Sequence, residues 1–245
     1  MGLASAGDGN PRAQVGQGGQ PELRVLISGA IATGKTTLGR LLAEDTTWIV
    51  LREDIRKYCY LPSYYREPAR WAFHTSVDFL TRKAFEQLSL DHPGRVVVHD
   101  LSLDEVFYVY CHKHYDDGRI SKRDIDCLAR LHAVMAGATG RPDLVVFLDA
   151  PSRVLLTRIR KRGRAYEHSV SLTYLQDICQ RYRRWVRSLE KTTRVLRLDT
   201  TVVNYAHDRQ HAAKVLDQIH SVVASLRHPS TGSCRSAARD AQRCE

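Results

Sequence analysis

The chain has 245 residues, of which 43% are hydrophobic, enough for the core of one α/β domain. No apolar run approaches the length of a membrane-spanning helix, so we expect a soluble protein with no membrane partner. A formal net charge of +10 raises the question of a nucleic-acid partner, and the answer depends on where the basic residues lie.

The two ends of the chain differ from its middle. Residues 1–21 are rich in Gly, Ala, Gln and Pro and have no periodic apolar pattern, and residues 228–245 are similar. Both segments are therefore predicted to be disordered tails on either side of a domain at 22–227. The cysteines are scattered without a Cys-x-x-Cys pair, which indicates reduced thiols in a cytoplasm. They are Cys59, Cys111, Cys127, Cys179, Cys234 and Cys244.

Short apolar runs alternate with longer helical patterns along the domain. The predicted strands are Leu23–Ser28, Trp48–Leu51, Val96–Asp100, Leu144–Asp149 and Val195–Leu198. Apolar residues at steps of three and four over 172–189 and 212–226 predict amphipathic helices. This alternation predicts an α/β fold, a parallel sheet of about five strands covered by helices on both faces.

The first predicted strand enters a Gly-x-x-x-x-Gly-Lys-Thr loop, the P-loop pattern. Its backbone N–H groups, with the N-terminus of the next helix, would cradle the phosphates of ATP or another nucleoside triphosphate. Lys35 would reach the β- and γ-phosphates, and the Thr36 hydroxyl would bind Mg²⁺. The predicted nucleotide-binding residues are Gly29, Ala30, Ile31, Ala32, Thr33, Gly34, Lys35, Thr36 and Thr37.

Two carboxylates stand where predicted strands end, at the edge of a parallel sheet where ligands bind. Glu53 follows the second strand and Asp100 ends the third. Beside a P-loop, such a carboxylate binds Mg²⁺ or accepts the proton of an attacking hydroxyl. The alternative is an acidic residue that caps a helix.

Basic residues concentrate between Arg153 and Arg187, a segment that contains ten basic residues and only two acidic ones. Such a cluster is a clamp for phosphates, a solvated helix face or a nucleic-acid surface. The P-loop favours the clamp, and we therefore expect no nucleic-acid partner.

Two further motifs resemble the deoxyribonucleoside kinase family, which includes the deoxycytidine, deoxyguanosine and bacterial deoxyadenosine kinases. Arg158-Ile-Arg-Lys-Arg162-Gly-Arg164-x-x-Glu167 is similar to the family's arginine-rich lid. Tyr65-Arg-Glu-Pro-x-Arg-Trp71-x-Phe73 is similar to the segment that lines its nucleoside pocket. The resemblance extends from about Arg24 to Leu226.

The resemblance implies a role for each matching residue. Glu53 would be the base that takes the proton of the sugar 5′-hydroxyl, and Lys35 with the lid residues Arg158, Arg162 and Arg164 would neutralise the phosphates. Tyr65 and Glu167 would hold the 3′-hydroxyl. The remaining candidates for the substrate pocket are Trp71, Phe73, Thr75, Ser76, Arg82 and Asp100, and Thr36, Glu53 and Asp100 are the candidates for Mg²⁺. A homodimer is expected from the resemblance alone.

The sequence departs from the family pattern at three places. Leu101 stands where the family has an arginine that positions the catalytic carboxylate, so either a neighbouring cation such as Arg52 or Arg82 replaces it or the carboxylate is held differently. Thr75 or Ser76 stands where a glutamine would read the base. Asp54 stands where a proline would follow the catalytic glutamate.

The leading hypothesis is an ATP-dependent kinase that phosphorylates the 5′-hydroxyl of a deoxyribonucleoside or an analogue. One alternative is a related phosphotransferase that acts on a nucleoside monophosphate or another small hydroxylated molecule, with Arg66, Arg70 and Arg82 available for an acceptor phosphate. The other is a nucleotide-binding regulator without turnover.

Overall fold

The computed structural model describes residues 22–89, 92–164, 167, 170–206 and 208–228. The predicted tail 1–21 therefore lies outside the described residues, and so does the predicted tail 228–245 except for His228. The described part contains a five-stranded parallel sheet with the order β2-β3-β1-β4-β5. The strands are β1 (Leu23–Ser28), β2 (Trp48–Leu51), β3 (Val96–Asp100), β4 (Leu144–Asp149) and β5 (Arg194–Asp199).

The predicted parallel sheet is confirmed, and its first four strands have the predicted bounds. The fifth runs one residue further at each end, because Arg194 pairs with Leu144 and Asp199 pairs with Asp149 on β4. Backbone pairing along the edge strand therefore includes two charged residues that an apolar pattern leaves out.

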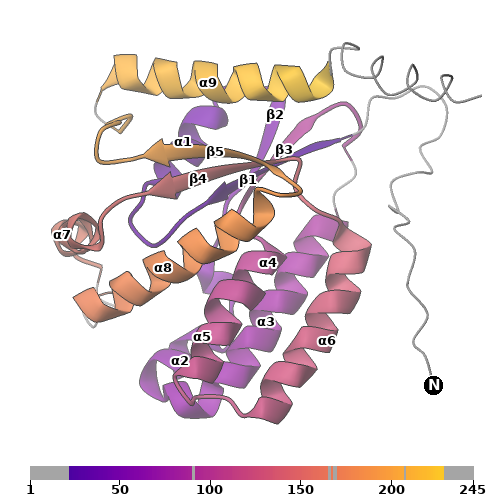
Figure 1. Cartoon of the computed structure of the whole chain (residues 1–245), viewed down its shortest axis with the longest axis vertical. Helices are drawn as coiled ribbons and strands as arrows, with labels where there is room; N and C mark the ends of the chain where they lie inside the picture. Colours follow the sequence, from indigo (N-terminus) through magenta and orange to yellow (C-terminus); the bar gives the residue numbers. More distant parts are fainter. Residues whose placement is uncertain (1–21, 90–91, 165–166, 168–169, 207, 229–245) are drawn as a thin grey trace, which may run out of the picture.

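Helices cover both faces of the sheet, and a helical bundle extends from it (Figure 1). The segments are α1 (Lys35–Leu42), η2 (Ile55–Lys57), α2 (Leu61–Arg66), α3 (Pro68–Leu88), α4 (Leu103–Glu105), the π-helical η3 (Val106–Cys111), α5 (His112–Asp116), α6 (Lys122–Thr139), α7 (Ser152–Arg162), α8 (Leu172–Leu189) and α9 (Arg209–Arg227). The stripes at 172–189 and 212–226 correspond to α8 and α9. Among the described residues, no helix has both the length and the apolar character needed to cross a bilayer.

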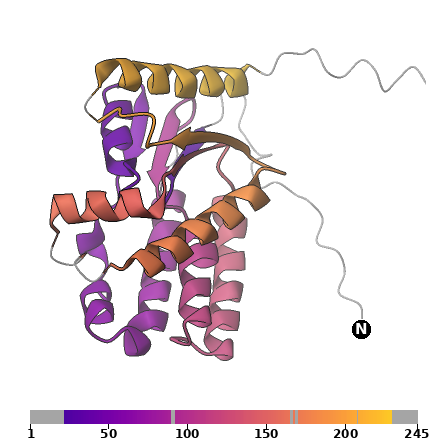
Figure 2. The same cartoon turned by 60° about the vertical axis from the view of Figure 1, so that its left-hand side comes forward.

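Alternate residues of the central strands enter two separate cores. Val25 and Ile27 of β1 pack with α1 and α9, whereas Leu26 between them packs with α7 and α8. Figure 2 shows α9 and α8 on opposite sides of the sheet. This burial on both faces explains why the strands are continuous apolar runs rather than alternating patterns.

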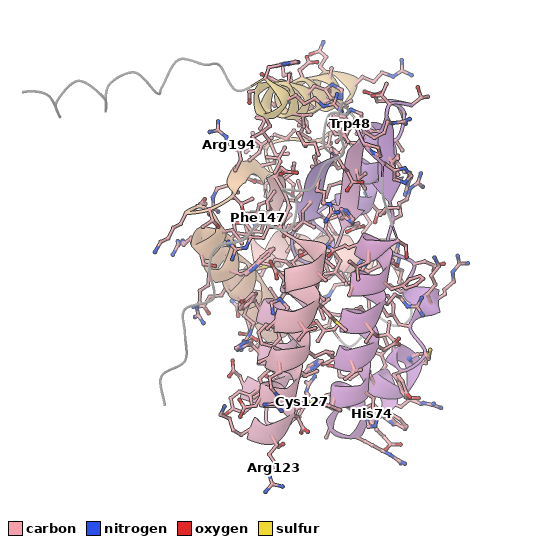
Figure 3. All side chains as sticks on the ribbon, turned by 90° about the vertical axis from the view of Figure 1, so that its right-hand side faces the viewer. Trp48, His74, Arg123, Cys127, Phe147 and Arg194 are labelled. Atoms are coloured by element: carbon pink, nitrogen blue, oxygen red, sulfur yellow. The ribbon has the colours of Figure 1, made fainter. Side chains whose placement is uncertain are left out.

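A third core lies in the bundle, between α3, η3 and α6. Figure 3 shows the two long helices side by side, with His74 on α3 and Cys127 on α6, and Trp48 of β2 under α9. Trp48 meets the His220 ring of α9 edge to face at 4.9 Å between centroids. The four cysteines in the described part of the chain are free thiols, and Cys234 and Cys244 lie outside it.

A buried carboxyl ties the bundle to the strand that precedes the P-loop. Glu105 is fully buried, accepts a 2.8 Å hydrogen bond from Ser28 Oγ, and accepts a 2.7 Å bond from the Ser102 backbone N–H. Ser102 Oγ in turn accepts from the Glu105 N–H, which completes a capping box at the start of α4. Burial raises the pKa of Glu105 to about 7.

The raised pKa makes the Glu105→Gln substitution a test of this buried contact. Above a pH of about 4.5 the unfolded chain releases the Glu105 proton, whereas the folded chain keeps it up to about pH 7. Wild type should therefore lose roughly 3 kcal/mol of stability relative to the glutamine variant as the pH rises through this window. Denaturant unfolding of both proteins at pH 5, 6, 7 and 8 measures the difference, and a difference that does not vary with pH would refute it.

A second prediction concerns Gly29, whose φ is +143°. A Cβ there would lie 2.4 Å from the backbone oxygen of Leu148, so Gly29→Ala must displace the loop or β4. A strained position of this kind costs about 1–3 kcal/mol, and we expect a lower Tm and no stabilisation by nucleotide. Gly39→Ala is the matched control, because its Cβ would make ordinary van der Waals contacts, at 3.6 Å with Val50 and 3.8 Å with Ile27. An undiminished thermal shift with ATP in Gly29→Ala would contradict the prediction.

Candidate functional site

The ends of three strands place the predicted phosphate-binding loop and the two predicted carboxylates at one edge of the sheet. In the parallel register, Ile27 of β1 pairs with Asp100 of β3, and Leu51 of β2 pairs with His99. The carboxyl ends of these strands therefore lie together. The loop 29–36 leaves β1 at this edge, and Glu53 follows two residues after β2.

The loop 29–36 encloses the lysine that was predicted to bind phosphate. Lys35 Nζ donates to the carbonyl oxygens of Gly29 at 2.6 Å and Ala30 at 3.2 Å, which keeps the ammonium inside the turn. Ala32 and Gly34 have φ values of +66° and +105°, which bend the backbone around that ammonium. The left-handed conformation at Ala32 costs energy, and such strain concentrates at ligand-binding loops.

A cavity of about 460 Å³ opens beside this loop. Lys35 and Glu53 line it, together with Tyr65, Thr75, Ser76 and Glu167 from the predicted substrate set. Residues from the P-loop, the segment after β2, the bundle and the segment before α8 thus share one cavity. Its volume is in the range of pockets that enclose small organic molecules.

Glu53 and Asp100 are poorly solvated carboxylates. Burial raises the pKa of Glu53, the nearby charge of Asp100 raises it further, and Lys83 and Lys35 oppose both effects. Burial also raises the pKa of Asp100, against the same two lysines. The Tyr58 hydroxyl donates to Glu53 Oε1 at 3.2 Å, which orients that carboxylate.

Neither carboxylate caps a helix. Asp54 caps η2 by accepting from the Arg56 N–H, and Ser102 caps α4. Asp100 Oδ1 is buried and has no hydrogen-bond partner in the described structure. A buried oxygen of this kind, beside a second carboxylate, fits a hard cation such as Mg²⁺.

Glu167 is almost completely buried and is paired with the predicted lid. Arg162 Nε donates to Glu167 Oε2 at 2.6 Å, Arg162 Nη2 donates to Oε1, and Arg164 Nη1 lies 3.7 Å from Oε1. The ion pair with Arg162 stabilises the charge of Glu167 at the cavity wall, where water solvates it little.

Other members of the basic cluster have different partners. Arg158 donates to the backbone oxygen of Thr200 at 2.6 Å and to the Ala32 oxygen at 3.4 Å, so it bridges α7, the segment after β5 and the P-loop. Arg183 makes two bonds to Asp149 at the end of β4. Arg181 contacts Asp116 and Asp177. Part of the cluster thus consists of structural ion pairs rather than a free cationic surface.

Four predicted substrate residues lie outside the cavity lining: Trp71, Phe73, Arg82 and Asp100. Trp71 stacks against Tyr60 at 5.7 Å between ring centroids, and Phe73 packs against the bundle core. The Arg82 guanidinium lies over the Tyr58 ring. Residues 68, 75, 76 and 79 of α3 line the cavity instead, because this face of the helix points toward the sheet edge.

The aromatic walls of the cavity were missed in the sequence. Phe79 of α3 and Tyr110 of η3 both line it. Residues 106–111 form a π-helix, a geometry that is rare overall but that often occurs at functional sites. No pattern in the sequence reveals it. Leu101 also faces the cavity from a left-handed backbone conformation, with φ at +77°.

A chain of hydrogen bonds at the cavity wall was also missed. Arg119 Nη1 donates to the Tyr64 hydroxyl at 2.6 Å, and Tyr64 lies 3.1 Å from His114 Nε2. His114 Nδ1 lies 3.2 Å from Ser76 Oγ, which itself donates to the Ala72 oxygen. Burial lowers the pKa of His114 to about 4, so the ring is neutral at pH 7.

The direction of each bond follows from this neutral ring. Because Ser76 uses its proton on Ala72, it accepts from His114 Nδ1–H, and Nε2 then accepts from Tyr64. The Ser76 proton is therefore already used within the protein. Thr75 Oγ1, in contrast, is buried in the cavity wall with no hydrogen-bond partner in the described structure.

Comparisons with known proteins agree with this geometry. A family model described as deoxynucleoside kinase matches residues 25–224. A deoxyadenosine/deoxycytidine kinase of Bacillus subtilis is 28% identical over 201 residues, covering 81% of this chain and 92% of that protein. A deoxyadenosine kinase of Dictyostelium discoideum is 27% identical and covers 71% of each chain.

The solved structure of deoxyadenosine kinase from M. mycoides with bound dCTP shares the fold. It superposes with a TM-score of 0.69 at 17% identity, over 81% of this chain and 100% of that one. The match of the family model over most of the domain settles the classification: the chain belongs to the deoxynucleoside kinase family and is a phosphotransferase that acts on a hydroxyl acceptor.

Proposed function

We propose that the protein transfers the γ-phosphoryl group of ATP to the 5′-hydroxyl of a deoxyribonucleoside, with Glu53 as the general base. The observation that carries this proposal is that Lys35 and Glu53 line one cavity with Tyr65 and Glu167. In this proposal, the cation that would bind phosphate, the base and the two residues that would hold the sugar surround one volume. Phosphoryl transfer needs this positioning and charge neutralisation rather than covalent chemistry.

Glu53 suits the role of a base because its carboxylate binds a proton more readily in this site than it would in water. Burial raises its pKa, which strengthens it as a proton acceptor, while Lys35 and Lys83 limit the rise. The bond from Tyr58 leaves the other carboxylate oxygen available to the substrate hydroxyl. The proton of the 5′-hydroxyl would pass to Glu53 as the oxygen attacks the γ-phosphorus and the bond to ADP breaks.

Thr36, Glu53 and Asp100 are the residues that would hold Mg²⁺. The unpartnered Oδ1 of Asp100 and the proximity of two carboxylates support this assignment. When bound with ATP, the ion would neutralise charge on the phosphate oxygens.

The lid remains part of the proposal. Arg162 and Arg164 adjoin Glu167, so a movement that brings them to the phosphates would also act on the residue expected to hold the 3′-hydroxyl. Arg158 already reaches the P-loop through the Ala32 oxygen. We further propose a cytoplasmic location and no nucleic-acid partner, and we name a homodimer as the assembly to test.

A nucleoside monophosphate is less well supported as the acceptor. Its phosphate would need cations in the cavity, and none of Arg66, Arg70 and Arg82 lines it. Lys113 and Arg119 do line it, but Lys113 is paired with Asp117 and Asp177, and Arg119 with Asp117.

Glu53→Gln tests the assignment of the base. The amide keeps the shape and can still accept from Tyr58, but it cannot take a proton, so kcat should fall by about 10²–10⁴ with little change in the KM for nucleoside. Steady-state assays of ADP formation measure both constants. Glu190→Gln, an exposed residue that pairs with Arg197, is the control. Retention of more than about a tenth of kcat would reject Glu53 as the base.

Thr75 generates a prediction about the range of bases. One hydroxyl cannot discriminate as a bidentate amide does, so several deoxyribonucleosides should be used with kcat/KM values within about two orders of magnitude. Loss of the 3′-hydroxyl should lower kcat/KM more than a change of base does, because Tyr65 and buried Glu167 would lose the hydroxyl that they are proposed to hold. Assays with the natural deoxyribonucleosides and a 2′,3′-dideoxy analogue compare the two effects. A preference above roughly 10⁴ for one base, with indifference to the 3′-hydroxyl, would contradict the prediction.

A further inference from the structure

Lys83 is a buried lysine on α3 that none of the predicted roles uses. The residue is 3% exposed, and its Nζ atom lies 3.0 Å from Glu86 Oε2 on the same helix. Nζ also donates to the backbone oxygen of Asp100, the last residue of β3, at 3.4 Å. A buried ammonium is costly unless it is paired, so its position between α3 and the sheet edge needs an explanation.

The charges around Glu53 and Asp100 indicate what Lys83 does. Glu53 is surrounded by Lys83 from α3, Asp100 from β3, Lys35 from α1 and the Tyr58 hydroxyl. Among these charged groups, Lys83 has the largest effect on the pKa of Glu53. For Asp100, Lys35 has the larger effect on the pKa and Lys83 the next. Lys35 is the other shared cation, but its ammonium is held by the carbonyls of the P-loop.

Among the hydrogen bonds and ion pairs of the described residues, Glu53 has the Tyr58 hydroxyl as a partner but neither Arg52 nor Arg82. Arg52 is exposed, and the Arg82 guanidinium lies 5.5 Å from the centroid of the Tyr58 ring. Leu101, directly after Asp100, brings an apolar side chain to the cavity. At the junction of α3 and β3, the side chain that brings positive charge to both carboxylates is therefore Lys83.

We propose that Lys83 is a positioning residue, whose ammonium anchors the end of β3 at Asp100 and offsets the repulsion between the Asp100 and Glu53 carboxylates. Two like charges in a poorly solvated site separate unless a cation lies near both. Lys83 keeps them close enough to act together on the 5′-hydroxyl and its phosphoryl donor. Glu86 holds the ammonium on α3 and has no direct part in the reaction. The inference rests on the proposed function, because it concerns the same two carboxylates.

Lys83→Met tests the proposal, because methionine removes the charge and fills a similar volume, although it leaves Glu86 without its cation. We expect kcat to fall by about 10- to 100-fold, the usual cost of losing a residue that supports a catalytic group. The KM for nucleoside should change by less than about three-fold, since Lys83 does not line the cavity. Lys83→Arg should restore most of the lost kcat, because it restores the charge.

Two further variants separate this role from a structural ion pair. Glu86→Gln removes the carboxylate that holds Lys83, and Lys122→Met removes a lysine from an exposed ion pair on α6 with Asp126. Both should keep kcat within about three-fold of wild type. If Lys83 served only to pair with Glu86, Lys83→Met and Glu86→Gln would lower Tm alike and leave kcat unchanged, and that result would overturn the proposal.

Binding of the divalent cation provides a readout besides activity. Removal of a positive charge beside two carboxylates strengthens their attraction for a cation, so Lys83→Met should bind Mg²⁺ more tightly than wild type in calorimetric titrations with ADP present. Weaker or unchanged binding, or an undiminished kcat, would overturn the proposal. If methionine prevents folding, Lys83→Gln is tested with the same expectations. Failure of the proposed function differs from these results, because wild type itself would then show no nucleoside-dependent turnover.

Discussion

The parallel pairing of β1, β2 and β3 is the constraint on which the site depends. Their register places the start of the P-loop, Glu53 and Asp100 at one edge, although 71 positions separate Gly29 from Asp100 in the sequence. No loop alone could hold these groups together against the conformational entropy of the chain. The two cores on either face of the sheet maintain that register, because a slip by one residue would exchange Leu26 with its neighbours between them.

The site gathers charges that water solvates poorly, and each carboxylate is balanced differently. Glu167 has the Arg162 guanidinium in a two-bond pair. Glu105 keeps its proton up to about pH 7 and uses neutral donors. Within the described part of the chain, Glu53 and Asp100 have no such direct partner cation and depend on the field of Lys35 and Lys83. Their oxygens therefore remain open for the proton and the Mg²⁺ that the proposed mechanism assigns to them, whereas the oxygens of Glu167 already accept hydrogen bonds from Arg162.

The sequence predicted those features that are local in the chain. The bounds of β1 to β4 follow from apolar runs buried on both faces, and the P-loop is one continuous motif. Lys83, Phe79 and the chain from Arg119 to Ser76 depend on how α2, α3 and α5 pack, and no spacing in the sequence encodes that contact. Helix rotation accounts for Trp71 as well: the residue is close in sequence to Thr75, yet it stacks on Tyr60 away from the cavity.

The identity of the phosphorylated product distinguishes phosphorylation of a deoxyribonucleoside from the alternatives. The full chain would be incubated with Mg²⁺, ATP labelled at the γ-phosphate and each natural deoxyribonucleoside, with Lys35→Ala as the matched control. We expect labelled deoxyribonucleoside 5′-monophosphate and ADP in equal amounts, and loss of both in the variant. Release of ADP without labelled nucleoside, or labelling of added nucleoside monophosphates alone, would contradict it.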